Sequence, residues 1–137
     1  MTTVEFYEKP GCANNTRQKI LLVQAGHTVW AKNLLTEPWT RDRLLQFFGN
    51  KPVADWFNRA APKIKSGEIV PEQIDADTAI AMMLSEPLLI RRPLIEAEGR
   101  REVGFDPIKI DAWLGLSKVP EGNIEGCAKK PGEKACK

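Results

Sequence analysis

The stretch that decides the fold is residues 4–26, VEFYEKPGCANNTRQKILLVQAG. It opens with Val4–Tyr7, a run of strand-forming side chains that ends at a Pro-Gly breaker pair. After Cys12 the pattern becomes helical, with Ile20–Val23 as its apolar part and Gly26 as the expected stop. The stretch therefore predicts a strand, a tight loop, a cysteine and a helix, in that order.

Cys12 lies where this loop meets the expected helix. The first N–H groups of a helix have no intrahelical partner, and they carry the positive end of the helix dipole. A thiolate is stabilised in that setting, so the cysteine becomes nucleophilic. The alternative is a small buried hydrophobic residue with no chemistry, which is the ordinary role of a lone cysteine. We favour the reactive thiol because Cys12 follows Pro-Gly and precedes a helix.

Length and composition indicate one globular domain. The chain has 137 residues, of which 42% are hydrophobic and 28% charged, as is ordinary for a soluble protein with a proper core. The formal net charge of +2 is low for a nucleic-acid-binding domain, so we expect no nucleic-acid partner. No apolar run has the length of a membrane span and no signal peptide is recognisable, so we expect no membrane association and a cytoplasmic location.

The cysteines match neither a disulfide framework nor a zinc motif. Three cysteines, an odd number, fit a reducing compartment. Asn15 occupies the position that the second cysteine of a Cys-x-x-Cys motif would take, and His27 is the single histidine. We therefore predict no metal site.

The sequence pattern in the middle of the chain predicts a strand followed by helices. Residues 27–32 contain strand formers, so a second strand follows the first helix and completes a strand–helix–strand unit with parallel pairing. Thr40 and Asp75 are expected to cap two later helices, and residues 62–71 are expected to form a loop between helices.

In the last third of the domain the sequence pattern changes from helical to strand-like. Residues 88–95 are expected to be extended, with residues 98–100 as a turn and 101–105 as the antiparallel partner strand. Asp106-Pro107 then starts a final helix. The predicted fold class is α/β, a thioredoxin-like βαβ plus ββα arrangement with a mixed four-stranded sheet and a helical insertion at about residues 40–87.

Four sequence segments carry a resemblance to a known family. They are FYEKPGCANNTR (6–17), WFNRAAP (56–62), MLSEPLLIRRPL (83–94) and VGFD (103–106). With them, residues 3 to about 116 resemble the arsenate-reductase-like (ArsC/Spx) group of the thioredoxin superfamily, and most closely the nitrogenase-associated proteins of that group. The resemblance implies a domain over residues 1–116, and the Gly- and Lys-rich residues 117–137 are expected to form a flexible tail.

The resemblance also implies a site. Cys12 falls on the family's catalytic cysteine, and Arg92 on the arginine before a cis-proline, which here would be Pro93. Arg59 lies near the family's other oxyanion-binding arginine. Planar guanidinium groups suit a tetrahedral oxyanion and would also stabilise a nearby thiolate.

The chain departs from both branches of the family. Glutathione-dependent arsenate reductases have a third arginine where this chain has Val103-Gly104-Phe105, and Asn15 removes the cysteine pair typical of the regulators. Cys127 and Cys136 in the tail could resolve an oxidised Cys12, because a flexible tail raises their effective concentration. The alternative is that they are exposed thiols without that role.

Two functions follow as expectations. The first is glutathione-linked thiol or oxyanion redox chemistry at Cys12, as in an arsenate-reductase-type oxidoreductase with no bound cofactor. Glutathione would be the co-substrate, and glutathione or glutaredoxin the partner. The alternative is a non-enzymatic binding or regulatory module associated with nitrogen fixation, with a nitrogenase-related protein as its partner.

Overall fold

The computed structural model describes residues 2–120. Cys127, Cys136 and most of the expected tail lie outside the described residues. Within residues 2–120, no helix has both the length and the apolar character needed to cross a membrane.

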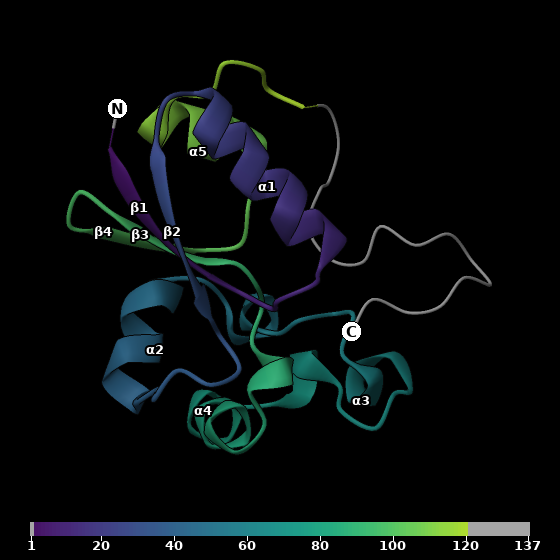
Figure 1. Ribbon diagram of the computed structural model, residues 1–137. Coiled ribbons are helices and arrows are strands. Elements are labelled where there is room, and N and C mark those ends of the chain that lie inside the picture. The colour runs from purple at the N-terminus through teal and green to yellow at the C-terminus, as the bar shows by residue number, and fades with distance from the viewer. Residues whose placement is uncertain (1, 121–137) are drawn as a thin grey trace.

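One four-stranded sheet organises the described chain (Figure 1). Its strands are β1 (Thr3–Glu8), β2 (Thr28–Asn33), β3 (Leu94–Ala97) and β4 (Arg100–Val103). The spatial order is β2-β1-β3-β4, with β1 and β2 parallel and the other two pairs antiparallel. The mixed sheet of a βαβ unit joined to a ββα unit is therefore confirmed.

Helices cover both faces of the sheet. The α-helices of the described residues are α1 (Ala13–Gln24), α2 (Arg41–Phe48), α3 (Pro62–Lys65), α4 (Ala76–Ser85) and α5 (Pro107–Leu114). Figure 1 shows α1 and α5 together on one face, with α2 and α4 on the other. The inserted segment therefore lies between β2 and β3 in the sequence and packs on one face in space.

Strand alternation divides the core into two clusters. Val4 and Phe6 of β1 point toward the α1/α5 face, whereas Tyr7 belongs to the cluster formed with the insertion. The same alternation separates Leu94, on the insertion side, from Ile95, on the α1/α5 side. Both faces of β1 and β3 are therefore buried, which fixes the pairing register of the central strands.

The apolar run Ile20–Val23 of α1 is only partly buried. Ile20 and Val23 are 51% and 56% exposed, and only Leu22 of that run is fully buried. Four consecutive apolar residues cover more than one face of a helix, so they cannot all point inward. The inner face follows the spacing of Asn14, Gln18 and Leu22, and its first two turns are therefore polar.

Two expected segments also differ from the structure. Residues 62–71 are not a plain loop, because α3 and the start of a 3-10 helix (Pro71–Gln73) lie there. Residues 88–95 are not one strand: a 3-10 helix (Pro87–Leu89) precedes β3, which begins at Leu94. Pro87 favours such a turn because its ring fixes φ at a helical value.

The N-caps expected from the sequence are confirmed. The side chains of Thr40, Asp75 and Asp106 accept hydrogen bonds from the backbone N–H groups of Arg43, Thr78 and Ile108, respectively. Each satisfies a donor that has no partner within its own helix.

Substituting Asp75→Asn is expected to make the free energy of unfolding less dependent on pH at acidic pH. The Thr78 N–H hydrogen bond lowers the pKa of Asp75 below its ordinary value of 3.8. Because the folded pKa is depressed, the associated stability is present above the unfolded pKa and is lost as the pH falls through the folded one. An asparagine at this position would keep a capping oxygen but cannot gain a proton. Urea unfolding between about pH 5 and pH 2 tests this, and an unchanged slope with pH would contradict it.

Candidate functional site

Cys12 occupies the N-cap position of α1. Its N–H donates to the Lys9 carbonyl at 3.1 Å, which closes the loop after β1, and its carbonyl accepts the N–H of Thr16 at 3.0 Å. The side chain is 1% exposed, and the first turn of α1 carries no acidic residue that would offset the helix dipole. Cys12 thus lies at the positive end of a twelve-residue helix, in a buried setting.

The peptide between Arg92 and Pro93 is cis, as the family resemblance implied. Register places it beside the Cys12 loop: β1 and β3 pair with Tyr7 opposite Leu94, so the end of β1 runs next to the residues preceding β3. On its other side, Gly104 N–H donates to the Pro93 carbonyl at 2.8 Å. The sheet therefore brings Arg92, Pro93 and the loop before Cys12 together.

Arg92 is buried with an unsatisfied donor. Its residue exposure is 5%, and its Nε has no hydrogen-bond partner in the part of the chain that the structure describes. The buried carboxylate at the end of β1, Glu8, is already paired with Lys19 at 2.8 Å. A buried cation with an unpaired N–H is unfavourable unless an anion pairs with its charge and accepts that hydrogen bond. Arg92 is therefore the clearest sign of a binding site near Cys12.

Asn15 and Gln18 are site residues that the sequence reasoning missed. Asn15 is 1% exposed; its Oδ1 accepts the Lys9 N–H at 3.1 Å, and its Nδ2 donates to Gln18 Oε1 at 3.0 Å. The pair therefore holds the loop that presents Cys12. For Gln18 the sequence did offer a signal, the i, i+4 spacing of Asn14, Gln18 and Leu22, which defines one helix face; this series does not include Asn15.

Asn15→Ala is expected to lower the free energy of unfolding by about 1–3 kcal/mol, because the buried Lys9 N–H would lose its acceptor. The exposed Asn50→Ala is the matched control and should change stability by less than about 0.5 kcal/mol. Urea denaturation measures both. Equal effects for the two variants would show that Asn15 does not hold the loop.

Arg59, the other expected oxyanion residue, is engaged elsewhere in the insertion. Its guanidinium pairs with the Glu72 carboxylate, and its side chain is 53% exposed. This hydrogen bond lowers the pKa of Glu72 below its usual range. Within residues 2–120 the recorded partners of Arg59 are Glu72 and the Ala54 carbonyl, so Cys12 and Arg92 are not among them. A role for Arg59 in oxyanion binding stays a prediction.

Phe105 follows the end of β4, in the segment where glutathione-dependent arsenate reductases have the third arginine. It is 1% exposed and packs in the apolar cluster under α1 and α5. Its aromatic ring supplies no hydrogen-bond donor to an oxyanion. The described site therefore has one buried guanidinium beside the Cys12 loop.

The described part of the chain contains no cluster of side chains that could bind a metal ion. Among residues 2–120, no group of three or more His, Cys, Asp and Glu side chains is placed to hold an ion.

The strand order, the cis-proline and the cysteine at the start of α1 define a thioredoxin-like protein. Residues 7–113 match the ArsC family, and the chain belongs to that family. The Cys12–Arg92 arrangement lies within the matched range.

The relatives of the chain include an uncharacterised protein and a transcriptional regulator. It is 46% identical to an uncharacterised 15.7 kDa protein in the draG 3′ region of Rhodospirillum rubrum, over 99% of this chain and 95% of the relative. It is 25% identical to the global transcriptional regulator Spx of Streptococcus pyogenes, over 81% of this chain and 84% of that protein.

Solved structures agree on the fold. A putative ArsC family related protein from Bacteroides fragilis superposes with a TM-score of 0.70 at 20% identity, covering 80% of this chain and 97% of the other. An arsenate reductase from Vibrio cholerae superposes with a TM-score of 0.62 at 24% identity, covering 75% and 90%. At these identities the likeness establishes the fold alone.

Proposed function

We propose that the protein binds a tetrahedral oxyanion between Cys12 and Arg92 and reduces it by thiol chemistry linked to glutathione. The observation that carries this proposal is the Arg92 Nε–H, buried and without a partner within the described residues. An oxyanion would accept that N–H in a charge-assisted hydrogen bond, which is stronger than a neutral one. The membership in the ArsC family and the helix N-terminus at Cys12 support the same assignment.

The proposed reaction balances with two thiols of glutathione as the reductant. The Cys12 thiolate attacks the central atom, a sulfur–oxyanion bond forms, and one oxygen leaves as water after taking up protons. The first glutathione thiol displaces Cys12 from the central atom. The second attacks the resulting glutathione sulfur and releases the reduced oxyanion, whose central atom has gained two electrons. The two glutathione molecules leave as one disulfide, and Cys12 returns to its starting state.

Thermal unfolding with arsenate as the probe tests the binding step. A ligand that binds the folded state at about one hundred times its dissociation constant adds about 2.7 kcal/mol of stability. We therefore expect the unfolding midpoint to rise with arsenate and not with chloride at equal ionic strength. Absence of any arsenate-specific rise would refute the proposed site.

Turnover tests the chemical step. With arsenate, glutathione and glutaredoxin present, we expect arsenite and glutathione disulfide to appear in equal amounts, as the balance requires. Binding of arsenate without turnover would support the oxyanion site but would contradict the proposed reductase activity.

A second candidate is a binding or regulatory module associated with nitrogen fixation. Two observations favour it: the stretch Val103-Gly104-Phe105, where the resemblance places the reductases' third arginine, supplies no guanidinium, and a 46% identical relative is described by its place in the draG 3′ region. Under this function a nitrogenase-related protein would be the partner, and Cys12 would sense oxidation rather than turn over.

Affinity capture from nitrogen-fixing cells separates the two candidates. Under this function both the tagged wild-type protein and the matched Cys12→Ser protein should retain a partner under reducing conditions. After oxidation the wild type should lose it, whereas Cys12→Ser, which has no thiol to oxidise at that position, should keep it. Recovery of no specific partner by either protein would count against the regulatory candidate.

A further inference from the structure

A second buried cation, Lys9, lies at the start of the loop that carries Cys12. Lys9 is 7% exposed and Arg92 is 5% exposed, and no other lysine or arginine among residues 2–120 is buried. The Lys9 carbonyl accepts the Cys12 N–H at 3.1 Å across Pro10 and Gly11, and Gly11 has a φ of 84°. This is the pattern of a type II turn, whose two ends have Cα atoms less than about 7 Å apart. Lys9 is therefore a close neighbour of Cys12.

The register of the sheet places Lys9 opposite Arg92. β1 and β3 are antiparallel, and the last recorded pair is Tyr7 opposite Leu94. Carried two positions further, the same register sets Lys9 opposite Arg92. Strand alternation puts both residues on the insertion side of the sheet, as it does for Tyr7 and Leu94. Like charges directly opposite one another across two strands are destabilising, so the two cations favour an anion between them.

Neither of these cations has a carboxylate partner of its own. Among residues 2–120, no ion pair includes Lys9 or Arg92, and the recorded hydrogen bonds of Lys9 are those of its backbone. The adjacent carboxylate, Glu8, lies on the other side of β1 by strand alternation, where it pairs with Lys19 at 2.8 Å. The charge of Glu8 is therefore matched by Lys19.

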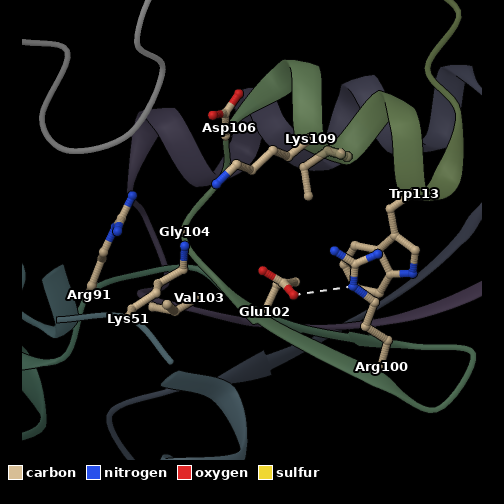
Figure 2. A pocket seen from close by; sticks show the side chains of 10 residues that line it. Lys51, Arg91, Arg100, Glu102, Val103, Gly104, Asp106, Lys109 and Trp113 are labelled. Carbon is tan, nitrogen blue, oxygen red and sulfur yellow. Dashed lines mark hydrogen bonds and ion pairs between the residues drawn. The ribbon is translucent and has the colours of Figure 1, made fainter. Parts of the chain in front are cut away.

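Two further carboxylates, Glu102 and Asp106, flank Gly104, whose N–H donates to the carbonyl of the cis-proline at 2.8 Å. Figure 2 shows Glu102 joined to Arg100, whose Nε donates to it at 3.2 Å. The same view shows Asp106 at the start of α5, where its carboxylate caps the helix. Both carboxylates keep their negative charge, but neither is recorded in an ion pair with the two buried cations.

We propose that Lys9 is a second cationic ligand of the oxyanion and makes the site select a dianion over a monoanion of the same shape. The inference rests on the oxyanion site proposed at Cys12 and Arg92. Arg92 supplies a directed N–H that any tetrahedral oxyanion can accept, whereas the Lys9 ammonium acts as a point charge. The attraction of a point charge grows with the charge of the ligand, so Lys9 discriminates by charge and Arg92 by geometry.

Selection by charge also favours the substrate of the proposed reaction over its product. Arsenate is chiefly a dianion in neutral solution, whereas its reduced form, arsenous acid, is uncharged there. The two-electron reduction therefore removes the Coulomb attraction between the ligand and the two cations. Lys9 thus helps the site to bind arsenate and to release the reduced product.

Isothermal titration of the full chain with sulfate and perchlorate tests the inference, with chloride holding the ionic strength constant. Both probes are tetrahedral oxyanions that the thiols do not reduce, and they differ in charge, since sulfate is a dianion and perchlorate a monoanion. We expect the wild type to bind sulfate more tightly than perchlorate by roughly tenfold.

Substitution of Lys9 separates its charge from its other properties. Lys9→Gln should weaken sulfate binding roughly tenfold and remove the preference over perchlorate, whereas Lys9→Arg, which keeps the charge, should preserve that preference. The exposed Lys65→Gln on α3 is the matched control and should bind both anions as the wild type does. The thermal midpoint of each variant in chloride shows that it folds.

The possible failures of this experiment are distinguishable. A folded Lys9→Gln protein with the wild-type affinity and preference for sulfate would overturn the assignment of Lys9 and leave the oxyanion site in place. Binding of arsenate without binding of sulfate would also overturn it, because the site would then select by a property other than charge. A wild type that binds neither arsenate nor sulfate would refute the oxyanion site itself.

Discussion

Arg92→Met is expected to make the protein more stable and to weaken its oxyanion binding. Arg92 is 5% exposed as a residue and its Nε has no hydrogen-bond partner among residues 2–120, so folding removes the guanidinium from water without a complete set of hydrogen bonds. An unsatisfied buried donor costs about 1–3 kcal/mol, and methionine of similar length fills the space without that cost. Urea unfolding should show a gain of that size in the free energy of unfolding.

The same substitution removes the donor that the oxyanion would use. A hydrogen bond to a charged group contributes about 1.5–3 kcal/mol, so the dissociation constant for arsenate should rise roughly 10- to 100-fold. Isothermal titration measures it. Arg41→Met is the matched control: its ion pair with Asp77 joins side chains that are 53% and 80% exposed, so it should alter neither affinity nor, beyond about 1 kcal/mol, stability.

The combination of the two effects separates a functional Arg92 from a structural one. A residue kept for stability would lower the free energy of unfolding when replaced. Loss of stability in Arg92→Met, together with unchanged arsenate affinity, would show that the Nε–H is satisfied by the protein and that no anion completes it.

Cys12→Ser is expected to abolish glutathione-linked turnover while leaving arsenate binding within about threefold of the wild type. The hydroxyl of serine is far less acidic than a thiol, so the nucleophile is lost. The loop geometry depends on backbone hydrogen bonds of residue 12 and on Asn15, which the substitution leaves in place. Residual activity above about one thousandth of the wild-type value would place the nucleophile elsewhere.

The tail cysteines supply the control for that experiment. In a Cys127→Ser, Cys136→Ser background, turnover with external glutathione should continue, because the proposed reaction takes both reducing thiols from glutathione. If turnover instead falls with the tail substitutions alone, one of these thiols resolves Cys12, which is the resolving role that the sequence allows for Cys127 and Cys136. Intact-mass analysis after partial turnover would then show a Cys12 disulfide within the chain.

Local sequence signals predicted the elements that position the site. A strand-forming run, a Pro-Gly pair and a helix gave the correct order around Cys12, and the capping side chains of Thr40, Asp75 and Asp106 marked three helix starts. These features depend on neighbours within a few residues, so the sequence alone contains them. The family resemblance added the cis peptide before Pro93, which no local pattern requires.

Features that depend on long-range packing were not predicted. The inner face of α1 is polar at Asn14, Asn15 and Gln18, and Asn15 accepts a backbone N–H of the loop after β1, while the apolar run at the end of the helix is half exposed. The engagement of Arg59 by Glu72 requires two segments of the insertion to meet, and sequence spacing gives no measure of that. The unpaired Nε of Arg92 likewise appears only once the sheet has formed.

The central claim is that a bound oxyanion accepts a hydrogen bond from the Arg92 Nε–H beside Cys12. The NMR resonance of the Arg92 Nε–H tests this claim most directly. On titration with arsenate, we expect this one side-chain signal to shift downfield and its exchange with water to slow, as a new charge-assisted hydrogen bond requires. The Nε–H signal of Arg59, whose terminal guanidinium nitrogens pair with Glu72, should remain unchanged. An Arg92 signal that stays fixed while arsenate saturates the protein would contradict the account and place the anion elsewhere.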